Sequence, residues 1–148
     1  MAEEFGDPLR IFQEDELRHL LAREVLRCTR YQDFLTLCLV RPVCPGPPVA
    51  VLQNAVAREI AEMLRSTDIV GVIEDDVAVL LVHTPAVDGT LIGVRIRERI
   101  ETTTFSLITP SQVTLNIGLS CFPTDATADR ALLAHAQAQL QAAPRARS

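Results

Sequence analysis

The chain has 148 residues, of which 48% are hydrophobic and 22% are charged, and this balance is typical of one packed globular domain. Its formal net charge is −5, and all 14 basic residues are arginine. A chain this acidic lacks the clustered basic surface that nucleic-acid binding requires, so no nucleic-acid partner is predicted. The absence of lysine excludes any mechanism within this chain that needs a lysine amine.

The four cysteines form no CxxC pair, and no histidine accompanies them at zinc-ligand spacing. We therefore expect no metal site, no cofactor and no disulfide framework. The first ten residues are acidic and do not resemble a secretory signal. The apolar run 37–40 is far shorter than the ~20 residues that span a bilayer. A cytoplasmic location without membrane insertion is predicted.

In chain order, the spacing of apolar residues predicts a helix at 14–31, a buried strand at 34–40, a helix at 49–64, strands at 68–73 and 77–82, a helix at 87–101, a strand at 113–121 and a closing helix at 128–143. Prolines predict a loop at 41–48, because proline lacks a backbone donor and fixes φ. The acidic residues at 74–76 predict a tight hairpin with a solvated tip. Strand 113–121 alternates apolar with polar residues, and this alternation places Ile117 on its core face and Asn116 on the other.

Without the first and last helices, the order of elements is strand, helix, strand, strand, helix, strand. This order predicts an α+β fold of the ferredoxin-like or palm type, in which an antiparallel βαββαβ sheet carries helices on its face. A leading and a closing helix are added to that core. We expect a single domain over residues 1–148, with a leading helix region at 1–31 and a palm-like core at 34–143.

Two stretches resemble the GGDEF, or diguanylate cyclase, domain. LRSTDIVGVIEDDVAVLLVHTPAVDGTLIGVRIRERIE, at 64–101, is similar to that family's RxxD segment, signature hairpin, strand and following helix. VTLNIGLSCFPTD, at 113–125, is similar to its TVSIGVA-like strand. With RYQDF after the leading helix, the resemblance covers most of the chain and implies a bacterial signalling protein.

In that family the domain joins two GTP molecules, and the resemblance implies a divalent cation held by carboxylates at the end of the first strand and at the hairpin tip. Here Val40 and Arg41 close the first strand instead. Both signature glycines are also replaced. We therefore expect no catalytic residue, no bound metal and a pseudoenzyme. The degenerate signature hairpin consists of Ile73, Glu74, Asp75, Asp76 and Val77.

Arg65 and Asp68 match the RxxD sequence that forms the family's inhibitory product site, and Arg95 lies about where a second arginine completes it. The resemblance implies that these three residues bind cyclic diguanylate. The arginine forks would bond to guanine or phosphate, and Asp68 would accept from N1 and N2 of guanine. The alternative is an ordinary helix-to-strand junction, in which Arg65 caps the preceding helix and Asp68 starts a strand.

Three functions stay open on the sequence. The leading one is a degenerate GGDEF-like domain that acts as a receptor for cyclic diguanylate. The second is a protein-interaction or dimerisation scaffold, including a homodimer, that binds no nucleotide. The third is an active diguanylate cyclase with an unusual metal site, against which Arg41 and the replaced glycines argue. The sequence names no protein partner and no additional domain.

Overall fold

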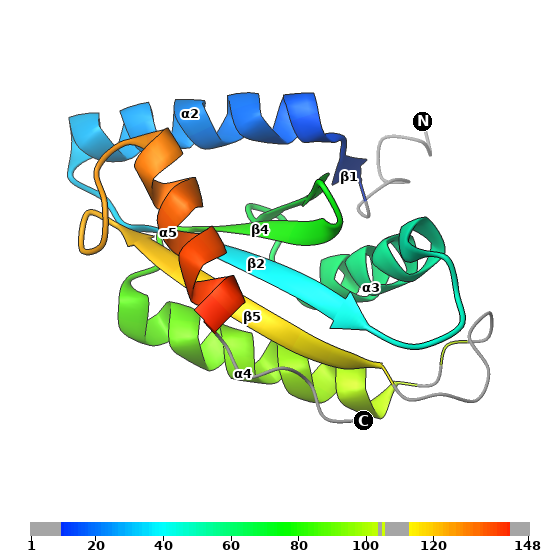
Figure 1. The fold of residues 1–148 in the computed structure, drawn as a ribbon. Coiled ribbons are helices and arrows are strands. Elements are labelled where there is room, and N and C mark those ends of the chain that lie inside the picture. The colour runs from blue at the N-terminus through cyan, green and yellow to red at the C-terminus, as the bar shows by residue number, and fades with distance from the viewer. Residues whose placement is uncertain (1–9, 104, 106–112, 143–148) are drawn as a thin grey trace, which may run out of the picture.

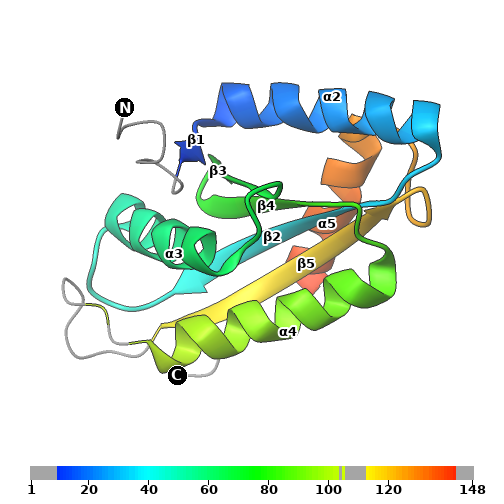
Figure 2. The same cartoon turned by 180° about the vertical axis from the view of Figure 1, so that it is seen from behind.

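The computed structural model describes residues 10–103, 105 and 113–142, and Figures 1 and 2 show these as one sheet with helices on both faces. The elements in chain order are β1 (Ile11–Phe12), α2 (Glu14–Tyr31), β2 (Leu35–Val43), α3 (Val49–Met63), β3 (Ile69–Ile73), β4 (Asp76–Val82), α4 (Ala86–Thr102), β5 (Thr114–Phe122) and α5 (Asp129–Ala142). The strand order is β1-β3-β4-β2-β5, with β1 parallel to β3 and all other pairs antiparallel. The predicted α+β palm-type fold is confirmed.

The leading and closing helices, α2 and α5, cover one face of the sheet, and α3 and α4 cover the other (Figure 1). Strand β2, which lies between β4 and β5, supplies both layers, because successive side chains of a strand point to opposite faces. Leu35, Leu37 and Leu39 pack toward α2 and α5, whereas Cys38 and Val40 pack toward α3 and α4. All five side chains are fully buried. The sheet therefore has no solvent-facing side along its centre.

The loop predicted at 41–48 begins too early, because β2 continues through Arg41 and Pro42 to Val43. Pairing with β4 stops at Val40, whereas pairing with β5 continues to Val43. Beyond Val40 the strand therefore has a neighbour on one side only. A proline is tolerated at such an edge, where its missing N–H faces no partner strand. The other predicted boundaries agree with the structure within one residue, and the predicted helix end at 143 lies outside the described residues.

Strand β5 is buried on both faces, which its alternating pattern did not indicate. Ile117 is only partly buried, whereas Gly118 and Ser120, on the polar side, are buried under α5. A Cβ atom at Gly118 would lie 2.2 Å from the carbonyl oxygen of Ala136 and 2.7 Å from the amide nitrogen of Leu140. The backbone of α5 therefore packs directly on the strand, and only glycine leaves room for it.

The two-residue strand β1 was not predicted, because Ile11 and Phe12 are too few to show a periodic pattern. They pair with Val70 and Gly71 at the edge of the sheet. None of the helices in the described ranges is both long and apolar enough to cross a membrane.

Candidate functional site

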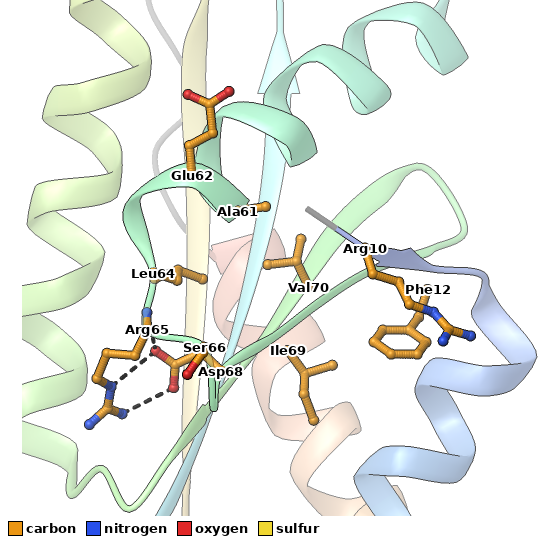
Figure 3. A pocket seen from close by; sticks show the side chains of 10 residues that line it. All are labelled: Arg10, Phe12, Ala61, Glu62, Leu64, Arg65, Ser66, Asp68, Ile69 and Val70. Carbon is orange, nitrogen blue, oxygen red and sulfur yellow. Dashed lines mark hydrogen bonds and ion pairs between the residues drawn. The ribbon is translucent and has the colours of Figure 1, made fainter. Parts of the chain in front are cut away.

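The connection between α3 and β3 carries the RxxD residues, and Figure 3 shows Arg65 and Asp68 facing each other across it. One carboxylate oxygen of Asp68 accepts from the Arg65 amide and from Arg65 Nε, both at 3.2 Å. The other accepts from Arg65 Nη2 at 3.0 Å and from the Val82 amide at 3.2 Å. The Asp68 side chain is 1% exposed. In this structure both oxygens of the Asp68 carboxylate therefore accept from donors of the chain itself, and its predicted contact with guanine stays a prediction.

Arg65 reaches across the junction to the end of β4. Besides its bonds to Asp68, Nη2 donates to the carbonyl oxygen of Val82 at 2.7 Å and to Thr84 Oγ1 at 3.2 Å. The hydrogen bond with Asp68 raises the pKa of the Arg65 guanidinium, which therefore stays charged. The alternative in which Arg65 caps carbonyls of the preceding helix is wrong, because its side chain bonds to Asp68, just before β3, and to Val82 and Thr84, at the end of β4 and just beyond it. Within the described part of the chain, Nη1 has no partner.

A pocket of about 230 Å³ lies between this junction and the start of α4, and all three residues predicted to bind ligand line it. Arg65 and Asp68 come from the junction and Arg95 from α4. Arg95 is exposed and forms no hydrogen bond or ion pair with the described residues. The fold therefore brings together three residues that are 30 positions apart in sequence, from 65 to 95. The lining of this pocket also includes His83, Thr84, Asp88 and Ile92.

His83 is already committed to another partner. Its Nδ1 is in hydrogen-bond contact with the Asp33 carboxylate, to which Arg27 Nη1 also donates at 2.8 Å. Burial alone would raise the pKa of Asp33, but hydrogen bonds from Arg27, the Phe34 amide and His83 outweigh it and hold that pKa below its usual value. Asp33 thus remains ionised and holds His83. Arg65, Arg95 and Asp88 are therefore the charged residues of the pocket that keep capacity for a ligand.

A larger pocket of about 770 Å³ lies on the other side of the junction (Figure 3). Its floor is apolar, and its far wall is the pair Arg10 and Phe12, in which the guanidinium lies 4.5 Å from the ring centroid. Figure 3 shows the Arg65 fork directed away from this pair. Sequence reasoning did not find Arg10 or Phe12, because they flank a strand too short to recognise.

The signature hairpin joins β3 to β4, and Ile73 pairs with Asp76, so the turn itself consists of Glu74 and Asp75. Asp76 is not solvated as predicted but 2% exposed. Its two carboxylate oxygens accept from Arg41 Nε at 2.8 Å and from Nη2 at 3.2 Å. The hydrogen bonds from Arg41 to Asp76 raise the pKa of the Arg41 guanidinium. A bidentate ion pair therefore joins the end of β2 to the hairpin.

The backbone of the turn is held as well. Gln53 Nε2, from α3, donates to the carbonyl oxygens of Glu74 at 3.0 Å and Asp76 at 2.8 Å. The Glu74 amide donates to Glu14 Oε1, from α2, at 2.9 Å. This backbone bond is the main cause that lowers the pKa of Glu14. Glu74 has φ of 53°, a conformation that glycine adopts at lower cost.

These residues do not fit a divalent cation. At the two positions where the resemblance implies metal-binding carboxylates, the chain has a guanidinium and the aspartate paired with it. Arg41 would repel the ion that the site should hold, and Asp76 has no oxygen left without a donor. Elsewhere in the described ranges, no three His, Cys, Asp or Glu side chains lie close enough to hold a metal.

The family model of the diguanylate cyclase, GGDEF domain matches residues 50–148, which include the junction, the hairpin, α4 and β5. The chain belongs to the GGDEF family. A comparison with curated protein sequences gives no match.

Solved GGDEF domains share the fold at low sequence identity. The FimX GGDEF domain from Pseudomonas aeruginosa has a TM-score of 0.78 at 16% identity, covering 93% of this chain and 91% of that one. The GGDEF domain of PA1120 (YfiN or TpbB) from the same organism has a TM-score of 0.73 at 20% identity, covering 91% and 94%. DgcB from Caulobacter crescentus, in complex with c-di-GMP, has a TM-score of 0.73 at 10% identity, covering 91% and 77%.

Proposed function

We propose that this GGDEF domain is a catalytically inactive receptor for cyclic diguanylate in bacterial signalling. Arg65 and Arg95 would contact the ligand, and Asp68 would be a positioning residue that holds Arg65. The observation that carries the proposal is that both arginines line one pocket and keep unused donors: Nη1 of Arg65 and the whole guanidinium of Arg95 have no partner among the described residues.

The chemistry of this pocket suits a guanine nucleotide. Each guanidinium offers a planar fork of donors that matches a phosphate or the O6 and N7 edge of guanine. Asp88 lines the same pocket, is exposed, and has no partner within the described ranges. Its carboxylate can accept from N1 and N2 of guanine, which is the role that the sequence had suggested for Asp68. The pocket therefore offers both the donors and the acceptor that a guanine ligand needs.

The hairpin supports the absence of catalysis. Family chemistry needs a cation and a backbone that approaches the nucleotide closely, whereas this hairpin has the Arg41–Asp76 ion pair and two acidic side chains in its turn. An active cyclase would need a changed strand end, a changed turn and a released Asp76 at the same time. Single substitutions are therefore not expected to create activity.

Calorimetric titration of the purified protein with cyclic diguanylate tests the receptor function. Arg95→Ala is the sharpest variant, because this exposed side chain has no structural partner in the described chain and its loss should leave the fold intact. We expect binding to the unmodified protein and at least about a tenfold loss with Arg95→Ala, since a charge-assisted hydrogen bond contributes about 1.5–3 kcal/mol.

Arg130→Ala is the matched control, because Arg130 is an exposed arginine on α5, on the opposite face of the sheet. It should bind like the unmodified protein. Absence of heat and of any thermal shift at millimolar nucleotide would overturn the receptor function. Equal losses with Arg95→Ala and Arg130→Ala would instead indicate a nonspecific charge effect and would remove the pocket from the proposal.

The second candidate function is a protein-interaction module. It is favoured by a separate observation, which is that α4 exposes three large apolar side chains away from the sheet: Val87, Leu91 and Val94. A domain that fails the titration and still self-associates would have this function instead.

A further inference from the structure

A pocket of about 460 Å³ lies at the end of the sheet opposite to the signature hairpin. It is enclosed by the end of α2, the start of β2, the end of β5 and the turn before α5. Figure 1 shows these segments, from residues 28–34 and 122–127, together at one side of the molecule. The two pockets beside the RxxD junction share no lining residue with it. It is therefore a separate candidate site.

The walls of this pocket are mainly apolar. Phe34, Phe122 and Pro123 contribute rings to the lining, together with the thiol of Cys28. Cys28 is fully buried, and burial raises its pKa to about 11, so the thiol is uncharged at neutral pH. Small-molecule sites in proteins have volumes of ~300–1,000 Å³ and apolar, often aromatic, walls. This pocket has the size and the lining of such a site.

The charge of the lining limits what the pocket can hold. Its one charged side chain is Asp33, and both carboxylate oxygens are occupied. One accepts from the Phe34 amide at 2.7 Å, and the other accepts from Arg27 Nη1 at 2.8 Å and contacts His83. Among the described residues, no arginine or histidine lines the pocket. A phosphate, carboxylate or sulfonate would therefore enter without a cation to pair with, which is costly.

Two polar side chains, Gln32 and Thr127, give the pocket a hydrogen-bonding rim. Both are exposed, and neither side chain has a hydrogen-bond partner in the described part of the chain. Further inside, water meets mostly carbon and sulfur and is held weakly, so an apolar group that displaces it is favoured. The pocket therefore suits a ligand with an apolar body and one polar substituent.

Hydrogen bonds of the backbone form both walls without a ligand. Gln32 ends α2 with a left-handed φ of 54°, and the amides of Gln32 and Asp33 both donate to the carbonyl oxygen of Cys28. On the other wall, the Asp125 amide donates to the Cys121 carbonyl oxygen at 2.7 Å, and the Cys121 amide donates to Asp125 Oδ2 at 2.8 Å. A pocket that is already formed has a lower ordering cost on binding.

We propose that this pocket binds a small, uncharged aromatic molecule that carries one hydrogen-bonding substituent. Its rings would pack against Phe34, Phe122 and Pro123, because contacts between rings contribute more than the burial of their area alone. The substituent would bond to Gln32 or Thr127 at the rim. Cyclic diguanylate carries phosphates, so it does not suit this pocket, and the two sites are independent proposals.

Fluorescence titration of the unmodified 148-residue protein with N-phenylnaphthylamine, without nucleotide, tests the proposal. This probe is aromatic and uncharged, has one N–H group, and becomes brightly fluorescent in apolar surroundings. Anilinonaphthalene sulfonate is the matched control ligand, because it has the same rings and an added negative charge. We expect saturable binding of the uncharged probe and at least about tenfold weaker binding of the sulfonate. Absence of saturable binding, or equal affinity for both probes, would overturn the proposal.

A pair of variants locates the probe. Thr127→Trp fills the pocket from its exposed rim and should weaken binding of the uncharged probe at least about tenfold. Leu91→Asp is the control, because it disrupts a different exposed apolar surface, on α4, where Leu91 is 57% exposed. It should bind the probe normally, and circular dichroism checks that both variants are folded. Normal binding by Thr127→Trp, or loss of binding in Leu91→Asp, would contradict the assignment to this pocket.

Thr127→Trp also gives a measurement that needs no probe, because the chain contains no tryptophan. If the pocket accepts an aromatic ring, the introduced indole should emit at shorter wavelength and resist quenching by acrylamide. Gln139→Trp is the matched control, since Gln139 is exposed on α5 and lies outside the pocket lining. Equal emission and equal quenching of the two variants would show that the pocket does not accept a ring. None of these results depends on nucleotide binding, so the receptor function is tested separately.

Discussion

The ion pair between Arg41 and Asp76 gives the most direct test of how the hairpin is held. Arg41→Met keeps most of the side chain's apolar volume and removes the guanidinium. Asp76 is 2% exposed, and its two carboxylate oxygens accept only from Arg41 among the described residues. The variant therefore leaves a buried carboxylate without a hydrogen-bond donor.

Breaking a fully buried pair in this way costs about 3–5 kcal/mol. The Arg41 side chain is 42% exposed, so water can reach the vacated position and reduces the expected cost to about 2–3 kcal/mol. For a chain of this length, that cost corresponds to a decrease in Tm of about 5–10 °C. Urea unfolding followed by circular dichroism measures the free energy of unfolding directly.

The double variant Arg41→Met with Asp76→Ala separates the pair from its two side chains. It removes the charge that Arg41→Met leaves unpaired, so it should be more stable than Arg41→Met alone. Arg130→Met is the control for loss of an exposed arginine and should change the free energy of unfolding by less than about 0.5 kcal/mol. If Arg41→Met is as mild as that control, or if the two substitutions at the pair are simply additive, the hairpin is not held by this ion pair.

Three further results are expected. With GTP and Mg²⁺ or Mn²⁺, the protein should form no cyclic diguanylate, and glycine at both 74 and 75 should not create activity; product detected by chromatography above a contaminant control would refute this. Gly118→Ala should destabilise the fold by about 3 kcal/mol or more in urea unfolding, because its Cβ would lie 2.2 Å from a backbone oxygen of α5, whereas Ser120→Ala should be mild. Burial raises the pKa of Cys38 to about 12, so in the native protein below pH 9 iodoacetamide should modify the partly exposed Cys44 first; mass spectrometry that finds Cys38 modified as fast would show that its strand opens.

The main elements could be predicted from the sequence because burial imposes a period on each of them. The apolar positions of α2 and the uninterrupted apolar run of β2 each indicate one structure. Pro42 misled the prediction because its effect depends on neighbours. A proline ends a strand that pairs with a neighbour on both sides. Here the pairing of β2 with β4 had already stopped at Val40, and only the pairing with β5 continued.

The site was predictable only as far as local motifs extend. Arg65 and Asp68 are three residues apart and were found by their spacing, but the role of Asp68 depends on the Val82 amide, which belongs to another strand. The pairing of Arg41 with Asp76 joins residues 35 positions apart, and no spacing rule covers such a contact. What each side chain is free to bind is decided by partners that the chain supplies from elsewhere.

The hairpin turn is fixed from three directions, by Glu14 of α2, Gln53 of α3 and Arg41 of β2. Helices α2 and α3 lie on opposite faces of the sheet, so these bonds restrain the turn from above and below at once. A loop held in this way has little freedom to reshape around an incoming molecule. It acts instead as a fixed point, and a displacement of α2 along its axis would be transmitted through the Glu14–Glu74 hydrogen bond to strands β3 and β4.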